Sequence, residues 1–268
     1  AMSIEYTPGP LLDAARNTPT ALWNDSSDPS ELAQSISFGG VGATCNPTIA
    51  YTCINQRRDV WLPRIAELAK EMPEATESEI GWQVVRELSL EAAKLLVPIF
   101  EAENGRNGRL SMQTDPRLAR SAKALADQAE EFHNLAKNII VKIPATSVGI
   151  EAIEEATYRG VSVNVTVSFS VAQAVVTGEA IERGLKRREA AGKDTSQMGP
   201  VVTLMVGRLD DWIKEVAKRD RLFIDPGHLE WCGIAAFKRA YQEFQKRGLR
   251  ARMLSAAFRN VMHWSEFV

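Results

Sequence analysis

The chain has 268 residues, of which 45% are hydrophobic and 25% are charged, and its formal net charge is -2. These values are ordinary for a soluble globular protein, and a nearly neutral chain gives no electrostatic reason to expect a nucleic-acid partner. No apolar run approaches the roughly 20 residues that span a bilayer, so we expect no membrane partner either. The length suits a single domain, which we expect to cover residues 1–268.

The cysteines and the first residues bear on the cellular compartment. The chain contains 3 cysteines, Cys45, Cys53 and Cys232, in scattered positions. An odd, scattered set does not suggest a disulfide framework and favours a reducing, cytoplasmic location. The opening AMSIEYTPGP lacks the basic and apolar segments of a signal peptide, and its Ala-Met resembles an expression remnant.

Short apolar or mixed segments recur along the chain, and a longer helical pattern follows each of them. Seven of these segments are predicted strands: TALWNDS (20–26), VGATCNP (41–47), RLSMQTD (109–115), IIVKIPA (139–145), SVNVTVSF (162–169), VVTLMVGRL (201–209) and RARMLSAAF (250–258). Strands that alternate with helices of this length indicate βα units around a parallel sheet.

The helical patterns between the strands have recognisable ends. Asp115 is the predicted N-cap of a helix over 115–138. The helix over 148–160 ends at Gly160, a residue type that commonly follows helix C-termini. The segment 51–108 is longer and more helical than one crossover requires, so we expect an insertion or several helices there.

The number of strands raises a question about the class of sheet. A (β/α)8 TIM barrel needs eight strands, and the pattern gives seven. After the seventh comes RNVMHWSEFV, which begins like another helix. Either the eighth strand lies beyond residue 268, or the number of strands is misjudged, or the barrel closes in another way. We predict the first, a TIM barrel that is truncated at its C-terminus.

Lys142 stands inside the buried strand 139–145, where an unpaired ammonium is costly. In a barrel strand alternate side chains point to the centre, so Lys142 would project into the interior near the carboxyl-terminal mouth, where barrel active sites lie. A desolvated amine is a usable nucleophile towards a ketone and forms a Schiff base with it. The alternative is a lysine that reaches out to solvent or pairs with a neighbouring carboxylate.

Asp25 is a candidate acid/base at the end of the first strand. Its carboxylate could exchange a proton with a substrate hydroxyl. The alternative is that Asp25 caps the helix that follows, although Asp28, directly before Pro29, is the better candidate for the cap.

Further polar residues lie at other strand ends, where apolar residues would pack more favourably. Asn46, Asn164 and Thr166 belong to this group, although Asn46 before a proline could equally be a turn residue. Arg208 and Arg259 each follow a strand closely, and their planar forks suit a phosphate or a similar oxyanion. For either arginine the alternative is a salt bridge to a nearby carboxylate such as Asp210.

Neither a metal nor an organic cofactor is expected. The histidines, His133, His228 and His263, stand in separate contexts without ligand spacing, which disfavours a metal-dependent enzyme. The segment GGVGAT (39–44) has glycines but lacks the lysine of a P-loop and the full dinucleotide-binding spacing.

Taken together, these residues resemble the transaldolase family of class I aldolases. The resemblance covers most of the chain, in the blocks LWNDSSD, GGVGATCNPTI, GRLSMQTDPRL, VKIPATSVGIEAI, GVSVNVTVSFSVAQA, MVGRLDDW and SAAFRN. It implies a (β/α)8 barrel and a Schiff base on Lys142. The other roles that it implies are acid/base chemistry for Asp25 with Asn46 beside it, contact with the imine for Asn164, positioning of a catalytic water for Thr166, and phosphate binding for Arg208 and Arg259.

Some positions depart from the family pattern. Transaldolases proper carry S-T-E-V-D where this chain has SMQTD, so Gln113 replaces the glutamate that helps to activate the water, and glutamine cannot titrate. A glutamine there is found in the related fructose-6-phosphate aldolases, which also carry a tyrosine where this chain has Met205. The serine that usually precedes the phosphate-binding arginine by two residues is Ala257, and Ser255 is the candidate to replace it.

The resemblance implies transfer of a dihydroxyacetone unit from a ketose phosphate to an aldose phosphate through a lysine Schiff base. One alternative is a C–C lyase similar to fructose-6-phosphate aldolase, because the glutamate is replaced. Another is a sugar-phosphate-binding protein without catalysis. The expected partners are small sugar phosphates, and a homo-oligomer is a possible assembly.

Overall fold

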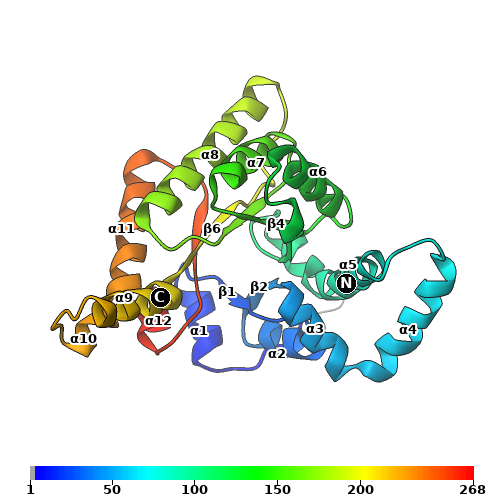
Figure 1. Ribbon diagram of the computed structural model, residues 1–268, viewed down its shortest axis with the longest axis horizontal. Helices are drawn as coiled ribbons and strands as arrows, with labels where there is room; N and C mark the ends of the chain where they lie inside the picture. The colour runs from blue at the N-terminus through cyan, green and yellow to red at the C-terminus, as the bar shows by residue number, and fades with distance from the viewer. Residues whose placement is uncertain (1–3) are drawn as a thin grey trace. The chain divides into compact units, whose positions relative to one another are not determined.

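Parallel strands and helices alternate along the chain in the computed structural model, which describes residues 4–268 (Figure 1). The chain divides into two compact units. The first unit runs to Gln113 and includes Phe132–Ile139, and the second unit comprises Thr114–Glu131 and Ile140–Val268. The expectation of a single domain stays a prediction. The described residues contain seven parallel strands with helices between them, which is the pattern of a (β/α)8 TIM barrel and confirms the predicted fold class.

The first unit contains three parallel strands in sequential order. They are β1 (Leu22–Asn24), β2 (Gly40–Thr44) and β3 (Arg109–Gln113). Trp23 pairs with Gly42, and a Cβ on Gly42 would lie 2.6 Å from the indole of Trp23. Strand β2 therefore needs a glycine at this position so that the tryptophan can lie against its backbone.

The helices of the first unit include a long connection between β2 and β3. The unit contains α1 (Pro10–Asn17), α2 (Pro29–Ser37), α3 (Pro47–Gln56), α4 (Arg58–Glu71) and α5 (Glu77–Ala102). For the segment 51–108 we expected either an insertion or several helices, and the structure shows several helices. A buried cluster from Cys45 through Trp61 to Leu88 packs α3, α4 and α5 together.

The second unit contains four parallel strands, again in sequential order. They are β4 (Ile139–Pro144), β5 (Val163–Thr166), β6 (Val201–Met205) and β7 (Arg252–Ala256). Apolar side chains of β4, β5 and β6 are almost completely buried, which explains why the three strands are visible in the sequence as short apolar runs.

Before its first strand, the second unit contains the 3-10 turn η1 (Pro116–Leu118) and most of α6 (Ala122–His133). The helices that follow its strands are α7 (Ser147–Tyr158), α8 (Val171–Ala190), α9 (Val206–Arg219), α10 (Pro226–Leu229), α11 (Cys232–Arg247) and α12 (Met262–Ser265). Helix α7 packs against α8, α8 against α11, and α11 against α9 (Figure 1). Throughout residues 4–268, every helix is too short or too polar to cross a membrane.

All seven predicted strands run past the carboxyl ends of the observed ones, the helix predicted over 115–138 is shorter than expected, and one predicted helix end is confirmed. Asp115 caps only η1, because Ser121 accepts a hydrogen bond from the backbone of Ala124 and so starts α6 separately. The predicted strand 201–209 stops at Met205, where α9 begins. Gly160 follows α7 with a φ of 97°, a conformation that glycine adopts without strain, as expected of a helix end.

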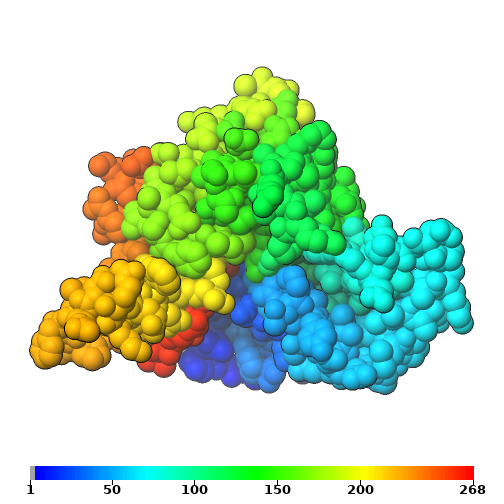
Figure 2. All heavy atoms as spheres, viewed as in Figure 1, coloured from blue at the N-terminus to red at the C-terminus, as the bar shows by residue number. Residues whose placement is uncertain are grey.

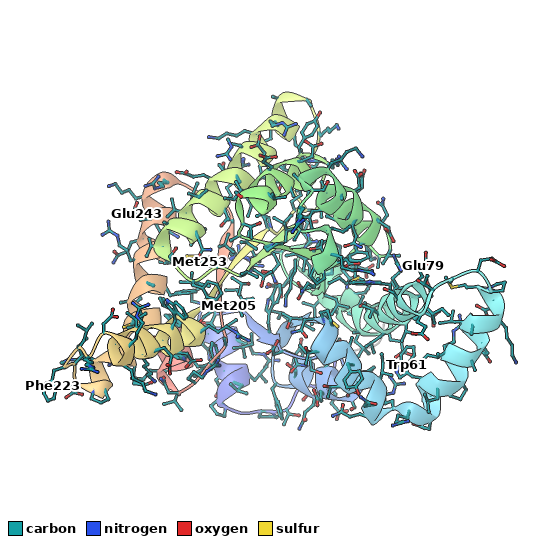
Figure 3. All side chains as sticks on the ribbon, viewed as in Figure 1. Trp61, Glu79, Met205, Phe223, Glu243 and Met253 are labelled. Atoms are coloured by element: carbon teal, nitrogen blue, oxygen red, sulfur yellow. The ribbon has the colours of Figure 1, made fainter. Side chains whose placement is uncertain are left out.

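A helical arm extends from the second unit beyond α9. It comprises the end of α9, the loop that follows and α10, and it forms the gold projection in Figure 2. Phe223 lies at the end of this arm with its ring fully exposed (Figure 3).

Candidate active site

Lys142 and Asn164 lie side by side on neighbouring strands of the second unit. They are paired across β4 and β5, and Pro144 and Thr166 form the next pair but one along the same strands. Paired residues of parallel strands point to the same side, so these four side chains share one face. Lys142 is half-buried, and both of its chain neighbours are fully buried on the opposite face. The expected association of Lys142 with Asn164 and Thr166 is therefore present in the second unit.

The amide of Asn164 is held in one orientation by a hydroxyl from the next strand. Asn164 is completely buried, and its Oδ1 accepts a hydrogen bond of 2.6 Å from Oγ1 of Thr203. Thr203 was not among the predicted site residues. The signal that marks it is a polar side chain inside an apolar strand, two residues before the strand end.

The register of β6 and β7 decides which of their residues share the face of Lys142. Asn164 pairs with Val201, so Met205, four residues further along β6, lies on the same face at the strand end (Figure 3). Ser255 pairs with Leu204 and therefore lies on the opposite face, where its hydroxyl is 3.5 Å from the carbonyl oxygen of His263. The register gives no support to Ser255 as an oxyanion ligand beside Lys142.

The two candidate phosphate-binding arginines differ in their contacts. Arg208 is exposed in the first turn of α9 and makes no ion pair in the part of the chain that the structure describes. Arg259 is also exposed, and its guanidinium lies 2.9 Å from a carboxylate oxygen of Asp211. The expected alternative partner, Asp210, pairs with neither arginine, because it is fully buried against His263. Arg208 thus presents a cation to solvent, whereas a ligand of Arg259 must compete with Asp211.

The turn after β7 lies directly on the first turn of α9. A Cβ on Gly207 would lie 1.8 Å from the carbonyl oxygen of Ala257 and 2.8 Å from Cγ of Arg259. No side chain caps α9 at its N-terminal residue, Met205. The amide groups that open this helix therefore lie next to the turn that carries Arg259, and helix N-termini favour anions.

The backbone at the end of β5 is strained and is held by one glutamine. Val167 has a φ of 54°, which is unfavourable for a β-branched residue. Gln173 accepts a hydrogen bond of 3.0 Å from the amide of Phe169 and donates through Nε2 to the carbonyl oxygens of Ala145 and Val167. This side chain therefore links the ends of β4 and β5 just beyond Thr166.

In the first unit, Asp25 is an exposed carboxylate at the end of β1. Its Oδ1 accepts a hydrogen bond of 2.6 Å from Oγ1 of Thr44, which is buried at the end of β2. The cap of α2 is Asp28, whose carboxylate accepts hydrogen bonds from the amides of Ser30 and Glu31. Asp25 is thus not a helix cap, and the expectation that Asp28 takes this role is confirmed.

Asn46 and Gln113 also lie at strand ends of the first unit. Asn46 is half-buried, and its Oδ1 caps α3 by accepting a hydrogen bond of 2.8 Å from the amide of Ile49. Asn46 is thus a helix cap rather than a turn residue, and the cap occupies only the oxygen of its side chain. Gln113 is the half-buried last residue of β3. Within residues 4–268, no three His, Cys, Asp or Glu side chains gather in a way that could hold a metal ion.

Comparison with known proteins identifies relatives across most of this chain. The model of the Transaldolase/Fructose-6-phosphate aldolase family matches residues 22–268. A protein named Transaldolase 2 from Streptomyces avermitilis is 35% identical over 67% of the chain, and a Transaldolase from Thiobacillus denitrificans is 35% identical over 67%. A further Transaldolase 2, from Streptomyces coelicolor, is 33% identical over 77% of the chain.

The three relatives are matched over only part of their length. The matches span 47%, 50% and 55% of the three relatives, so the chain corresponds to about half the length of these proteins. The family match extends from the first residue of β1 to residue 268 and includes Asp25, Asn46, Gln113, Lys142 and Asn164. The chain therefore belongs to the transaldolase/fructose-6-phosphate aldolase family.

Proposed function

We propose that this protein transfers a dihydroxyacetone unit from a ketose phosphate to an aldose phosphate through a Schiff base on Lys142. The observation that carries the proposal is the pairing of Lys142 with Asn164 on one face of β4 and β5, in a member of this family. An amine next to a buried, oriented amide is suited to form and hold a covalent intermediate.

The first step forms the imine. Nζ of Lys142 adds to the carbonyl carbon of the ketose, and water leaves as the carbon–nitrogen double bond forms. The amide of Asn164, whose oxygen is engaged by Thr203, is proposed to hold a hydroxyl of the bound sugar next to the imine. Thr203 therefore acts through Asn164 by fixing its orientation.

The second step breaks the bond between C3 and C4 of the sugar. The electron pair of that bond moves into the protonated imine, which becomes an enamine, and the proton of the C4 hydroxyl goes to Asp25. The hydrogen bond from Thr44 to Asp25 supports this role because it orients the carboxylate that must accept the proton. An aldose phosphate leaves, and the enamine then adds to the aldehyde carbon of the acceptor, whose oxygen takes the proton back from Asp25. Water then adds to the new imine carbon and breaks its bond to nitrogen, which releases the ketose phosphate product and restores the amine of Lys142.

The charged and polar residues around these groups are proposed to bind substrate. Arg208 and Arg259 suit the phosphate of the donor, because guanidinium groups bind oxyanions through paired donors. Asn46 can offer its amide nitrogen to a sugar hydroxyl while its oxygen caps α3. Thr166 and Gln113 are proposed to position a water molecule that supplies or takes the protons of the imine steps.

A second candidate function is aldol cleavage, in which the enamine is protonated and dihydroxyacetone is released. Gln113 favours this candidate, because a glutamine at this position is shared with the aldolase group of the family. A glutamine can orient a water but cannot titrate, so the proton relay differs from that of transaldolases proper.

The 3 free cysteines support a reducing compartment such as the cytoplasm as the place of action. Cys45 and Cys53 are buried, Cys232 is partly buried, and none of them forms a disulfide within the described residues.

Borohydride trapping tests the covalent step directly. The purified protein is incubated with fructose 6-phosphate, reduced with sodium borohydride and measured by intact mass and peptide mapping. We expect one adduct, on Lys142, and we expect Lys142→Ala to abolish it together with more than 99% of turnover, because no other group supplies the imine nitrogen. Lys137→Ala, a matched change at an exposed lysine paired with Glu101, should leave the adduct unchanged.

The same system separates the candidate functions. Transfer requires an acceptor aldehyde, whereas free dihydroxyacetone in the absence of an acceptor indicates aldol cleavage. If no tested ketose gives an adduct, the enzymatic proposal is wrong and a non-catalytic sugar-phosphate-binding protein is left.

A further inference from the structure

A carboxylate and an imidazole are paired in the interior of the second unit, away from solvent. Asp210 of α9 and His263 of α12 are both completely buried, and Nε2 of the histidine lies 2.7 Å from Oδ2 of the aspartate. Both helices lie near the end of the chain in Figure 1. A buried pair of this kind needs partners for its remaining polar atoms, because each unsatisfied one is costly.

The remaining polar atoms of the pair bond to the backbone. Oδ1 of Asp210 accepts a hydrogen bond of 2.7 Å from the amide of Gly233, in the first turn of α11. Nδ1 of His263 accepts a hydrogen bond of 2.9 Å from the amide of Arg259. Since Nδ1 accepts, the ring proton of the neutral imidazole is on Nε2, which donates to Asp210. The pair therefore fixes one tautomer.

The geometry makes one continuous line of hydrogen bonds from α11 to the backbone of Arg259. The turn between Arg259 and His263 is closed as well, because Oδ1 of Asn260 accepts hydrogen bonds from the amides of Met262 and His263. The start of the turn, at Ala257, packs directly against the backbone of Gly207. The backbone that carries the Arg259 guanidinium is thus fixed from inside the unit, while the guanidinium itself is exposed.

We propose that Asp210 and His263 are positioning residues that set the direction of Arg259 for the phosphate of the donor. The proposal rests on the phosphate-binding role proposed for Arg259. Neither residue of the pair contacts the reacting atoms. Their contribution is to hold the amide of Arg259 in place, so that the guanidinium meets the phosphate without reorganisation of the turn.

Asp210→Asn tests the pair by changing the hydrogen-bonding character of one group. The amide oxygen of the new side chain can still accept from Gly233, but its NH2 group then faces Nε2 of His263. The imidazole must take its proton on Nδ1, which places two donors opposite each other at the amide of Arg259. We expect the KM for fructose 6-phosphate to rise about three- to tenfold with kcat nearly unchanged, and the Kd of inorganic phosphate, measured by calorimetry, to rise by the same factor.

Unphosphorylated donors and a control variant separate positioning from a purely structural role. The rate of borohydride trapping with fructose or dihydroxyacetone should be the same in Asp210→Asn as in the unmodified protein. Lys238→Ala removes another tether of the last helical turn, the ion pair with Glu266, and should change none of these values. Because Asp210 and His263 are proposed to act only through Arg259, the loss of phosphate affinity in Arg259→Ala is the upper limit for the loss in their variants.

Two substitutions of the histidine provide a second test if Asp210→Asn does not fold. His263→Asn places an amide oxygen where Nδ1 accepts the Arg259 amide, whereas His263→Gln reaches towards Asp210 and leaves that amide without its partner. We expect the asparagine variant to keep phosphate affinity closer to that of the unmodified protein than the glutamine variant does.

Three outcomes are decisive. Equal losses of kcat with phosphorylated and unphosphorylated donors, at unchanged phosphate affinity, would show that the pair serves only stability and would overturn the proposal. Unchanged phosphate affinity in Arg259→Ala would remove the basis of the inference while leaving the trapping of Lys142 intact. Failure of trapping alone would contradict the proposed reaction, but the phosphate affinities would still decide the role of the pair.

Discussion

At the scale of residues, the balance of charge around Arg259 governs its use as an anion ligand. Nε of Arg259 donates to Asp211 at 3.0 Å, and Nη1 donates to the carbonyl oxygens of Ala257 and Phe258. The ion pair with Asp211 is exposed, so it adds little to stability. It keeps a carboxylate where, in the proposed function, a phosphate oxygen binds.

Asp211→Asn should therefore improve the binding of phosphorylated donors. The substitution removes a negative charge beside the phosphate and replaces a competing carboxylate with a neutral amide. We expect the KM for fructose 6-phosphate to fall about two- to fivefold, in line with the small energies of exposed ion pairs. Asp220→Asn, which changes the exposed pair with Arg219 at the other end of α9, is the control and should leave KM unchanged. A higher KM in Asp211→Asn would mean that the carboxylate orients Arg259 rather than competing for it.

Asp28 stabilises α2 as its N-cap, and this contribution to the free energy of unfolding depends on pH. Burial alone would raise the pKa of its carboxyl, but hydrogen bonds from the Ser30 side chain and from the amides of Glu31 and Ser30, together with the nearby Arg57, lower it below its usual value. A group whose pKa is lowered by folding stabilises the protein above its unfolded pKa, and this stabilisation is lost as the pH falls through the folded pKa.

Asp28→Ala should destabilise the protein by about 1 kcal/mol at pH 7, because the helix loses its N-cap. The difference from the unmodified protein should shrink below about pH 4, where the carboxylate becomes protonated. Urea unfolding at pH 7 and pH 3 measures it. Thr146→Ala removes a cap that cannot titrate, the hydroxyl that accepts from Gly149, so its effect should be the same at both values of pH.

At the scale of elements, the start of α9 and the turn after β7 depend on each other through Gly207. The distance of 1.8 Å between an added Cβ and the carbonyl oxygen of Ala257 leaves no room for a side chain. Any larger residue must push the turn away from the helix, and the turn carries Arg259.

Gly207→Ala should lower the free energy of unfolding by about 1–3 kcal/mol and weaken phosphate binding at the same time, as expected for overpacking against backbone. Gly81→Ala is the matched control. Gly81 is an exposed residue inside α5 with no atom within 4 Å of an added Cβ, so alanine should stabilise the helix by about 0.5–1 kcal/mol. Thermal unfolding and phosphate calorimetry on both variants check the contrast; a stable Gly207→Ala with normal phosphate affinity would contradict it.

At the scale of the whole molecule, the fold features that the sequence predicts are those that a short segment of the chain encodes by itself. Strands β4, β5 and β6 can be recognised because each is a short, buried apolar run, and helix ends can be recognised by residues such as Asp28 and Gly160. Lys142 was recognisable as a charge within such a run. These features are local, and each can be recognised from a few neighbouring residues.

The features that were missed depend on partners that are distant in the chain. Thr203 matters because the register brings it to Asn164, and Ser255 lies on the other face because it pairs with Leu204. Asp210 was expected at an arginine, yet it is buried against a histidine 53 residues further on. Hydrogen bonds between such residues follow from tertiary packing, which no single segment of the sequence encodes.

The strained turn at Val167 has a consequence for anyone who wishes to make this protein more heat-resistant. A glycine at this position would adopt the positive φ without strain and should therefore raise the melting temperature. The same exchange would let the segment beyond Thr166 sample more conformations, restrained by the side chain of Gln173 and by the hydrogen bond from the amide of Met205 to the carbonyl oxygen of Ser168. Thermal stability and an ordered chain at the end of β5 are therefore opposed at this one residue, so selection for survival at high temperature alone would favour the less ordered segment.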